Sequence, residues 1–185
     1  MSQKLVLFGD SLFARCSKHL MLLLEARLYA HYDAYNCAVG GWDSSDIVKK
    51  APYIATLKPE VVVISVGTND ASPWKQVELA DFEANIKQIL QAFNGSKVIF
   101  FLPPPVHAAS LPAGKEISNQ DVKQYHDAAK AIVEKAGAGF INSWEIFMPL
   151  QEKGESYHID DGVHLNDRGY DLLFTAIKEV ILSEI

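Results

Sequence analysis

The chain has 185 residues, 49% hydrophobic and 22% charged, which fits one globular domain and excludes low-complexity disorder and collagen-like repetition. Its 17 lysines and arginines against 23 aspartates and glutamates give a net charge of −6. That charge argues against a nucleic-acid partner, because phosphate binding depends on basic patches. No linker, repeat or charge block divides the sequence, so residues 1–185 are interpreted as a single domain.

Strand patterns and helix patterns alternate along the chain. Continuous apolar runs predict buried strands at 5–8, 61–66 and 98–102, and weaker patterns predict strands at 32–39 and 140–141. Apolar residues at helical spacing predict helices at 12–28, 79–93, 121–136 and 167–184. A polar loop containing Pro and Gly occupies 103–118. The alternation predicts an α/β fold with helices on both faces of a parallel sheet, in which ligands bind at the carboxyl ends of the strands.

Cysteine usage and the N-terminus bear on the cellular compartment. Cys16 and Cys37 form no disulfide framework and no C-x-x-C pair, which fits a reducing environment. The apolar run at 5–8 is followed at once by Asp10 and is too short for a secretory signal. The apolar stretch at 19–30 contains charges and is too short to span a bilayer. The protein is therefore expected to be cytoplasmic, without a membrane segment.

Two stretches that follow predicted strands carry reactive or flexible residues. In Gly9-Asp10-Ser11-Leu12, Ser11 stands at a strand-to-helix turn, where its hydroxyl reaches the mouth of the sheet and its backbone N–H can bind an oxyanion. A plain N-cap role is the alternative. Gly40-Gly41 follows the next strand and allows a ligand to approach the backbone closely, with an ordinary tight turn as the alternative.

Two further stretches supply an amide donor and a carboxylate–imidazole pair. Asn69 can present a side-chain donor where the strand at 61–66 ends, and Asp70 can stiffen that loop, unless both form a simple Asx-turn. Asp161 and His164 are three residues apart, so the carboxylate can reach Nδ1–H and leave Nε2 as a general base. The alternative is solvated loop charge.

Together these stretches resemble the four blocks of the SGNH (GDSL) hydrolase family, in family order from residue 9 to residue 164. The resemblance implies a flavodoxin-like, three-layer α/β/α fold with a five-stranded parallel sheet. It also implies that Ser11 is the nucleophile, His164 the base and Asp161 the residue that orients it. The implied oxyanion hole consists of the Ser11 N–H, the Gly41 N–H and the Asn69 side chain.

Two positions in the blocks are ambiguous. Gly41 fits better than Gly40, because the family glycine lies five residues after the asparagine of its block, here Asn36. Asp161 fits better than Asp160, because only Asp161 has the three-residue spacing to the histidine.

Several other residues have expected supporting roles. Asp10 and Asp70 are expected to support the site, and Trp42 and Trp74 either wall the acyl pocket or pack in the core. The remaining histidines share no metal-ligand spacing, and the sequence contains no Walker A, G-x-G-x-x-G or H-E-x-x-H motif. No metal and no cofactor are expected.

The activity expected from the resemblance is hydrolysis of short-acyl carboxylic esters through an acyl-serine intermediate, with a small-molecule ester as the partner. Deacetylation of a carbohydrate is the second expectation, and lysophospholipase or thioesterase activity is the third. From other classes, a non-catalytic binding module on the same fold and a flavodoxin-like nucleotide binder stay open. The loop at 103–118 is expected to shape the pocket. The sequence leaves the natural substrate and the oligomeric state open.

Overall fold

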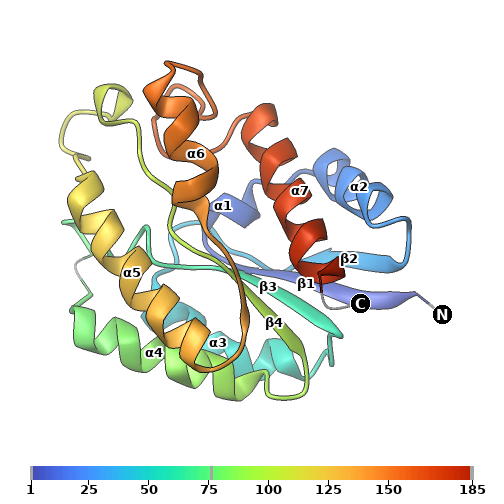
Figure 1. The fold of residues 1–185 in the computed structure, drawn as a ribbon. Helices are drawn as coiled ribbons and strands as arrows, with labels where there is room; N and C mark the ends of the chain where they lie inside the picture. The colour runs from blue at the N-terminus through green and yellow to red at the C-terminus, as the bar shows by residue number, and fades with distance from the viewer. Residues whose placement is uncertain (1, 76, 184–185) are drawn as a thin grey trace.

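The computed structural model describes residues 2–75 and 77–183. A single sheet of five parallel strands runs through its centre (Figure 1). The strands are β1 (Gln3–Gly9), β2 (Tyr32–Asn36), β3 (Val61–Ser65), β4 (Lys97–Phe101) and β5 (Gly139–Ile141). Their order is β2-β1-β3-β4-β5, and every pair is parallel. This is the flavodoxin-like order, so the predicted fold class is confirmed.

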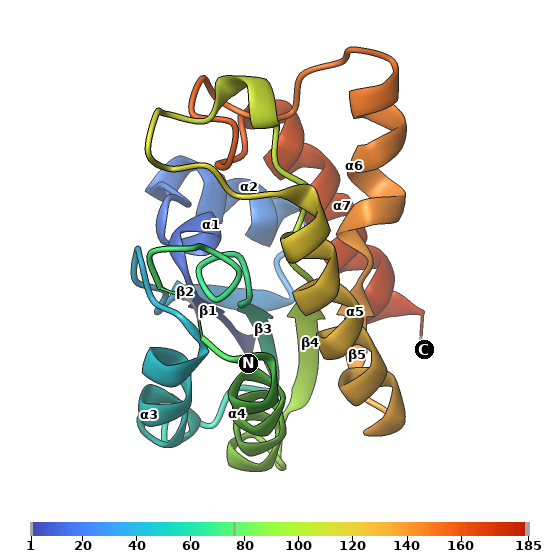
Figure 2. The same cartoon turned by 90° about the vertical axis from the view of Figure 1, so that its left-hand side faces the viewer.

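Helices cover both faces of the sheet and make three layers (Figures 1 and 2). One face carries α1 (Ser11–Ala14), α2 (Lys18–Arg27), α6 (Ser143–Glu152) and α7 (Asp167–Leu182). The other carries α3 (Ser44–Ala55), α4 (Leu79–Ala92) and α5 (Asn119–Lys135). In β1, Leu5 and Leu7 belong to the first apolar cluster, whereas Val6 and Phe8 belong to the second. Successive side chains point to opposite faces of a strand, so one apolar run contributes to both clusters.

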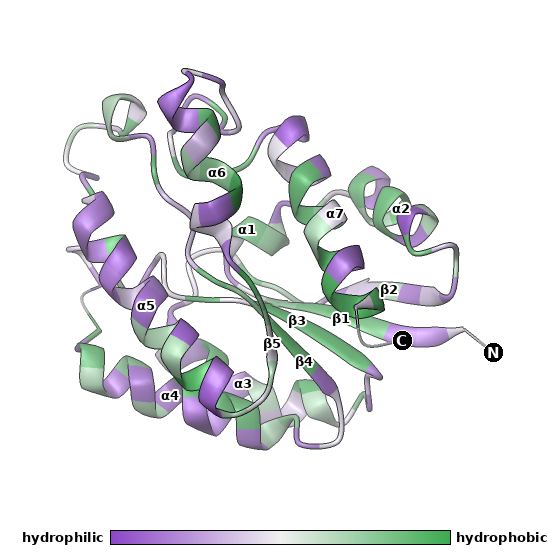
Figure 3. Ribbon diagram, viewed as in Figure 1, coloured by the Kyte–Doolittle hydropathy of each residue, from purple (hydrophilic) through white to green (hydrophobic). Residues whose placement is uncertain are grey.

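Hydropathy follows this layering. Figure 3 shows the central strands as mostly apolar and α4 and α5 as alternating between apolar and polar stretches. Such a pattern is that of surface helices packed on a buried parallel sheet. Within residues 2–75 and 77–183, none of the helices combines the length and the apolar character that crossing a membrane requires.

Two predicted elements were wrong in their extent. The helix expected over 12–28 is two helices, because the side chain of Ser17 accepts a hydrogen bond from the Leu20 N–H and starts α2 afresh. The strand expected over 32–39 ends at Asn36. For the last helix, the predicted end at Glu184 lies outside the described residues.

Two helices, α3 and α6, were not predicted at all. Each contains a proline, Pro52 in α3 and Pro149 in α6, and proline usually ends a helix. The capping box formed by Asp43 and Asp46 was the overlooked signal for α3. The overlooked signal for α6 was the N-cap residue Asn142, whose side-chain oxygen accepts a hydrogen bond from the backbone N–H of Glu145.

Candidate active site

The loop after β1 brings Ser11 to the carboxyl edge of the sheet. Gly9 ends β1 with φ +127°, and a Cβ there would lie 2.0 Å from the carbonyl oxygen of Ser65 in β3. Only glycine permits this close approach. Ser11 therefore begins α1 between β1 and β3, where the chain order reverses and ligands bind in sheets of this type.

Ser11, His164 and Asp161 form a continuous chain of polar contacts. Nε2 of His164 lies 2.8 Å from Oγ of Ser11, and Nδ1 lies 2.7 Å from Oδ2 of Asp161. The other oxygen of Asp161 accepts backbone N–H bonds from Val163 at 3.0 Å and from His164 at 2.9 Å. The carboxylate is thus held on one side by the backbone and faces the imidazole on the other.

The pKa of Asp161 reflects this arrangement. Partial burial raises it, but the hydrogen bonds from the backbone and ring of His164 and from the Val163 N–H outweigh burial and hold it below the ordinary value. The carboxylate is therefore ionised at neutral pH. Arg15 adds a positive charge, with its guanidinium 3.9 Å from Oδ2 of Asp161.

The Ser11 turn, the Gly41 loop and the Asn69 side chain each keep an N–H group that no backbone or side-chain hydrogen bond among the described residues uses up. Ser11 stands at the first position of its helix, and neither its backbone N–H nor that of Gly41 takes part in a backbone hydrogen bond in the described part of the chain. Gly40 brings the Gly41 loop against Ser11, since a Cβ on Gly40 would lie 3.8 Å from the Ser11 Cβ. Asn69 donates one amide N–H to the carbonyl oxygen of Trp42 at 2.8 Å, which leaves its second N–H available.

Asp10 and Asp70 are both buried and tie the site loops together. Oδ1 of Asp10 accepts from the Leu12 N–H at 3.0 Å and from the Ser65 hydroxyl at 2.8 Å, which joins the Ser11 turn to β3. Asp70 accepts from the Ser44 N–H at 2.9 Å and so anchors the start of α3, just after the Gly41 loop. Burial raises the pKa of Asp10, and it raises the pKa of Asp70 to about 6.

The pKa of Asp70 leads to a testable stability profile. The folded protein keeps the Asp70 proton up to about pH 6, whereas the unfolded chain loses it near pH 3.8. The folded state then binds more protons between these values, so the free energy of unfolding falls as pH rises through this window. We expect the part of this decline that Asp70 contributes, at most about 3 kcal/mol, to be absent in Asp70→Asn. Urea unfolding of both proteins from pH 4 to pH 7 measures it, and parallel pH profiles would contradict the assignment.

A small apolar-walled cavity of about 190 Å³ opens beside Ser11 and His164. Trp74 and Asn69 line it, and Nζ of Lys115 lies 4.5 Å from the centre of the Trp74 ring. The other residues that line it are Thr68, Ser72, Leu111, Pro112, Ile117, Asp161 and Val163. Trp42 is not among them, because its ring packs edge-on against Phe8 in the core, as the packing alternative expects.

Several of these residues were not predicted from the sequence. The 103–118 loop was expected to shape the pocket, but none of its side chains was predicted to line it, and the loop contributes Leu111, Pro112, Lys115 and Ile117. Arg15 was also missed. No local pattern marks these residues, since their places depend on how distant segments fold together. Among the described residues, no group of three or more His, Cys, Asp or Glu side chains could hold a metal ion.

The family of the chain follows from its match to known proteins. Residues 7–172 match the model of the GDSL-like lipase/acylhydrolase family. The chain belongs to this family. The predicted family is thereby confirmed, and with it the expectation of a carboxylic ester hydrolase.

Individual relatives agree with this assignment. The chain is 25% identical to mouse (Mus musculus) isoamyl acetate-hydrolyzing esterase 1 homolog, over 98% of its own length and 82% of the relative's. It is 23% identical to a GDSL esterase/lipase of Arabidopsis thaliana, over 97% and 86%.

Solved structures share the fold over nearly the whole chain. A lipase/acylhydrolase from Enterococcus faecalis superposes with a TM-score of 0.88 at 25% identity, covering 98% of this chain and 96% of the other. The acetyl xylan esterase AlAXEase superposes with a TM-score of 0.80 at 20% identity, covering 97% and 100%.

Proposed function

We propose that this chain hydrolyses short-acyl carboxylic esters through an acyl-serine intermediate. The observation that carries the proposal is the hydrogen-bonded chain from Ser11 through His164 to Asp161. A serine hydroxyl is a weak nucleophile unless a neighbouring base takes its proton. Nε2 of His164 lies at hydrogen-bond distance from that hydroxyl, and the Asp161 carboxylate holds the proton on Nδ1 so that Nε2 can accept.

In the first half of the proposed reaction, Oγ of Ser11 attacks the ester carbonyl while Nε2 of His164 takes the hydroxyl proton. The tetrahedral intermediate collapses when the imidazolium returns that proton to the leaving alkoxide, which departs as the alcohol. In the second half, His164 activates a water that attacks the acyl-serine, and the carboxylic acid is released. Asp161 stays ionised throughout and stabilises the imidazolium.

Asn69 is proposed to donate to the oxyanion together with the N–H groups of Ser11 and Gly41. Such a donor acts mainly in the transition state, so Asn69→Ala should lower kcat by roughly 10² to 10³ and change KM little. Asn69→Asp should be at least as damaging, because a carboxylate repels the developing negative charge. Steady-state kinetics with a p-nitrophenyl ester measures both variants, and melting temperatures serve as the control. Activity that falls only in proportion to stability would make Asn69 a turn residue.

The size and lining of the ester cavity favour small substrates. A volume of about 190 Å³ lies below the roughly 300–1,000 Å³ of a drug-sized ligand site. Trp74 and the apolar residues of the 103–118 loop offer contacts to a short acyl or alcohol group, and little burial for a long lipid tail. The mouse relative is named for the hydrolysis of isoamyl acetate, a short-acyl ester, and this supports the same choice.

A panel of substrates tests the proposal. We expect kcat/KM to be highest for p-nitrophenyl acetate to butyrate and to fall steeply with longer acyl chains. Acetylated sugars, lysophospholipids and acyl thioesters, assayed beside them, represent the alternative activities. A preference for any of these would overturn the short-ester assignment. If the folded, unmodified protein hydrolyses none of these substrates, a non-catalytic binding module would be favoured.

A further inference from the structure

A positive charge stands in the wall of the ester cavity. Lys115, from the 103–118 loop, lines this cavity together with Trp74, which follows β3. Nζ of Lys115 lies 4.5 Å from the centre of the Trp74 ring. The face of an aromatic ring attracts a cation, and tryptophan does so most strongly. This contact keeps the charged end of Lys115 at the cavity, next to Trp74.

The backbone around Lys115 forms a closed turn. The Lys115 N–H donates to the Pro112 carbonyl at 2.9 Å, and Gly114, the third residue of this turn, has a φ of +78°. A positive φ at the third position is typical of type II turns and favours glycine. Oε1 of Glu116 accepts from the Gly114 N–H at 2.9 Å and braces the turn. The place of Lys115 is therefore set by its own loop as well as by Trp74.

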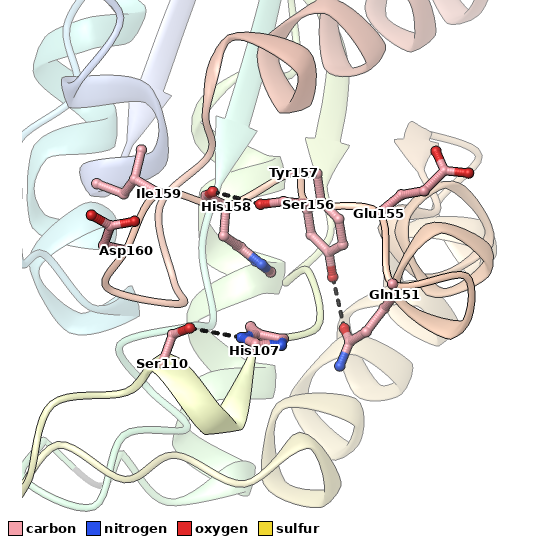
Figure 4. Close-up of a pocket in the computed structure, with 10 residues that line it drawn as sticks. His107, Ser110, Gln151, Glu155, Ser156, Tyr157, His158, Ile159 and Asp160 are labelled. Carbon is pink, nitrogen blue, oxygen red and sulfur yellow. Dashed lines mark hydrogen bonds between the residues drawn. The ribbon is translucent and has the colours of Figure 1, made fainter.

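The ammonium of Lys115 has neither an ion pair nor a hydrogen bond among the described residues. Of the described residues that line the ester cavity, Asp161 alone is acidic, and it bonds to His164 and lies 3.9 Å from the guanidinium of Arg15. Asp160 belongs instead to the lining of a second cavity, of about 220 Å³ (Figure 4). The ester cavity thus presents a positive charge that the described part of the chain leaves unpaired.

An unpaired ammonium beside apolar walls favours a ligand of opposite charge. Leu111, Ile117 and Val163 line the same cavity as Lys115. Attraction between charges grows as water is replaced by apolar groups, so a carboxylate held here is attracted more strongly than one in bulk water. It also accepts charge-assisted hydrogen bonds from the ammonium. Because Ser11 lines this cavity too, a small ester can contact both residues at once.

We propose that Lys115 determines substrate specificity, and that the site prefers short esters that carry a carboxylate a few carbon atoms from the ester carbonyl. The carboxylate belongs to the acyl part or to the alcohol part of the ester. This inference rests on the ester hydrolysis proposed above. The ion pair forms away from the reacting carbonyl, so it stabilises the bound substrate and the transition state alike. It should therefore lower KM and leave kcat nearly unchanged.

Two pairs of matched esters test the inference, and in each pair a carboxylate replaces a terminal methyl group. Ethyl butyrate and monoethyl succinate differ on the acyl side, whereas propyl acetate and 3-acetoxypropionate differ on the alcohol side. Titration of the released acid at constant pH gives kcat and KM for all four. We expect KM to be about fivefold lower for the anionic ester in at least one pair, as suits an ion pair that water reaches. The pair that shows the preference identifies the part of the ester that meets Lys115.

Three variants separate the charge of Lys115 from its packing. Lys115→Met keeps a flexible chain over Trp74 without the charge, so the preference should vanish while KM for the neutral esters changes little. Lys115→Arg keeps the charge and stacks on aromatic rings, so the preference should remain. Lys135→Met is the matched control, because Lys135 is exposed at the end of α5, just before β5 begins at the opposite edge of the sheet. It changes the net charge equally and should keep the preference.

Three outcomes would overturn the inference. The first is a KM for the neutral ester that equals or lies below that of the anionic ester in both pairs. The second is a preference for the anionic ester that survives in Lys115→Met. The third is an equal rise of KM for neutral and anionic esters in Lys115→Met, which would make Lys115 a support of the loop. If the unmodified protein hydrolyses p-nitrophenyl acetate but shows no such preference, this inference alone fails. If it hydrolyses no ester, the proposed function fails with it.

Discussion

Ser11→Ala is expected to abolish ester hydrolysis while the protein stays folded. Without Oγ no acyl-enzyme can form, and loss of the nucleophile in a comparable serine triad lowers kcat on the order of 10⁶. The Ser11 side chain is partly buried and forms a hydrogen bond with His164 at the edge of the sheet, so its removal leaves the core intact. The melting temperature should therefore change little. Kinetics with p-nitrophenyl acetate and a thermal melt measure the two effects.

A fluorophosphonate probe, which reacts with nucleophilic serines, tests the role of Ser11 independently of kinetics. The unmodified protein should gain one adduct, which mass spectrometry should locate on Ser11. Ser72→Ala is the matched control, because Ser72 lines the same cavity but donates its hydroxyl to the Thr68 carbonyl at 2.9 Å. This control should keep both labelling and activity. Labelling that survives in Ser11→Ala would place the nucleophile elsewhere.

The residues that sequence reasoning singled out lie in short local motifs, and this is why they could be predicted. Gly9 ends the apolar strand β1, Ser11 follows it, and Asn69 follows the apolar strand β3. In a parallel sheet the carboxyl ends of neighbouring strands meet at one edge. Ser11 and His164 are 153 residues apart in sequence, yet the fold brings their side chains to 2.8 Å. The resemblance of these motifs, in their order along the chain, to the SGNH (GDSL) hydrolase family was what implied that meeting.

Residues placed by long-range packing could not be predicted. Lys115 over the Trp74 ring depends on the path of a long loop, and no periodicity specifies such a path. The burial of His158, whose Nε2 has no hydrogen-bond partner among the described residues, likewise depends on distant segments packing together, and its chain neighbours give no sign of it. The break between α1 and α2 was hidden for another reason: the apolar residues on both sides keep helical spacing across Ser17, and only the capping bond reveals the new start.

Asp161→Asn is expected to lower kcat by about 10⁴, whereas Asp160→Asn should be nearly silent. In the variant, the amide oxygen can keep the backbone bonds from Val163 and His164, which turns the amide N–H₂ toward Nδ1 of the ring. An N–H donor there favours the tautomer that carries its proton on Nε2, and that nitrogen can no longer accept from Ser11. Loss of the correct tautomer costs about four orders of magnitude in a related triad.

The Asp160 variant makes the comparison specific. Asp160 carries the same charge on the same turn, but its side chain is exposed and lines the second cavity instead of facing His164. Its substitution therefore changes the net charge equally and leaves the imidazole contact intact. We expect kcat within about threefold of the unmodified protein for Asp160→Asn, since exposed charges contribute little at a distance. Steady-state kinetics of the two variants at pH 8 measures the contrast. The reverse ranking would mean that Asp160, and not Asp161, orients the histidine when substrate is bound.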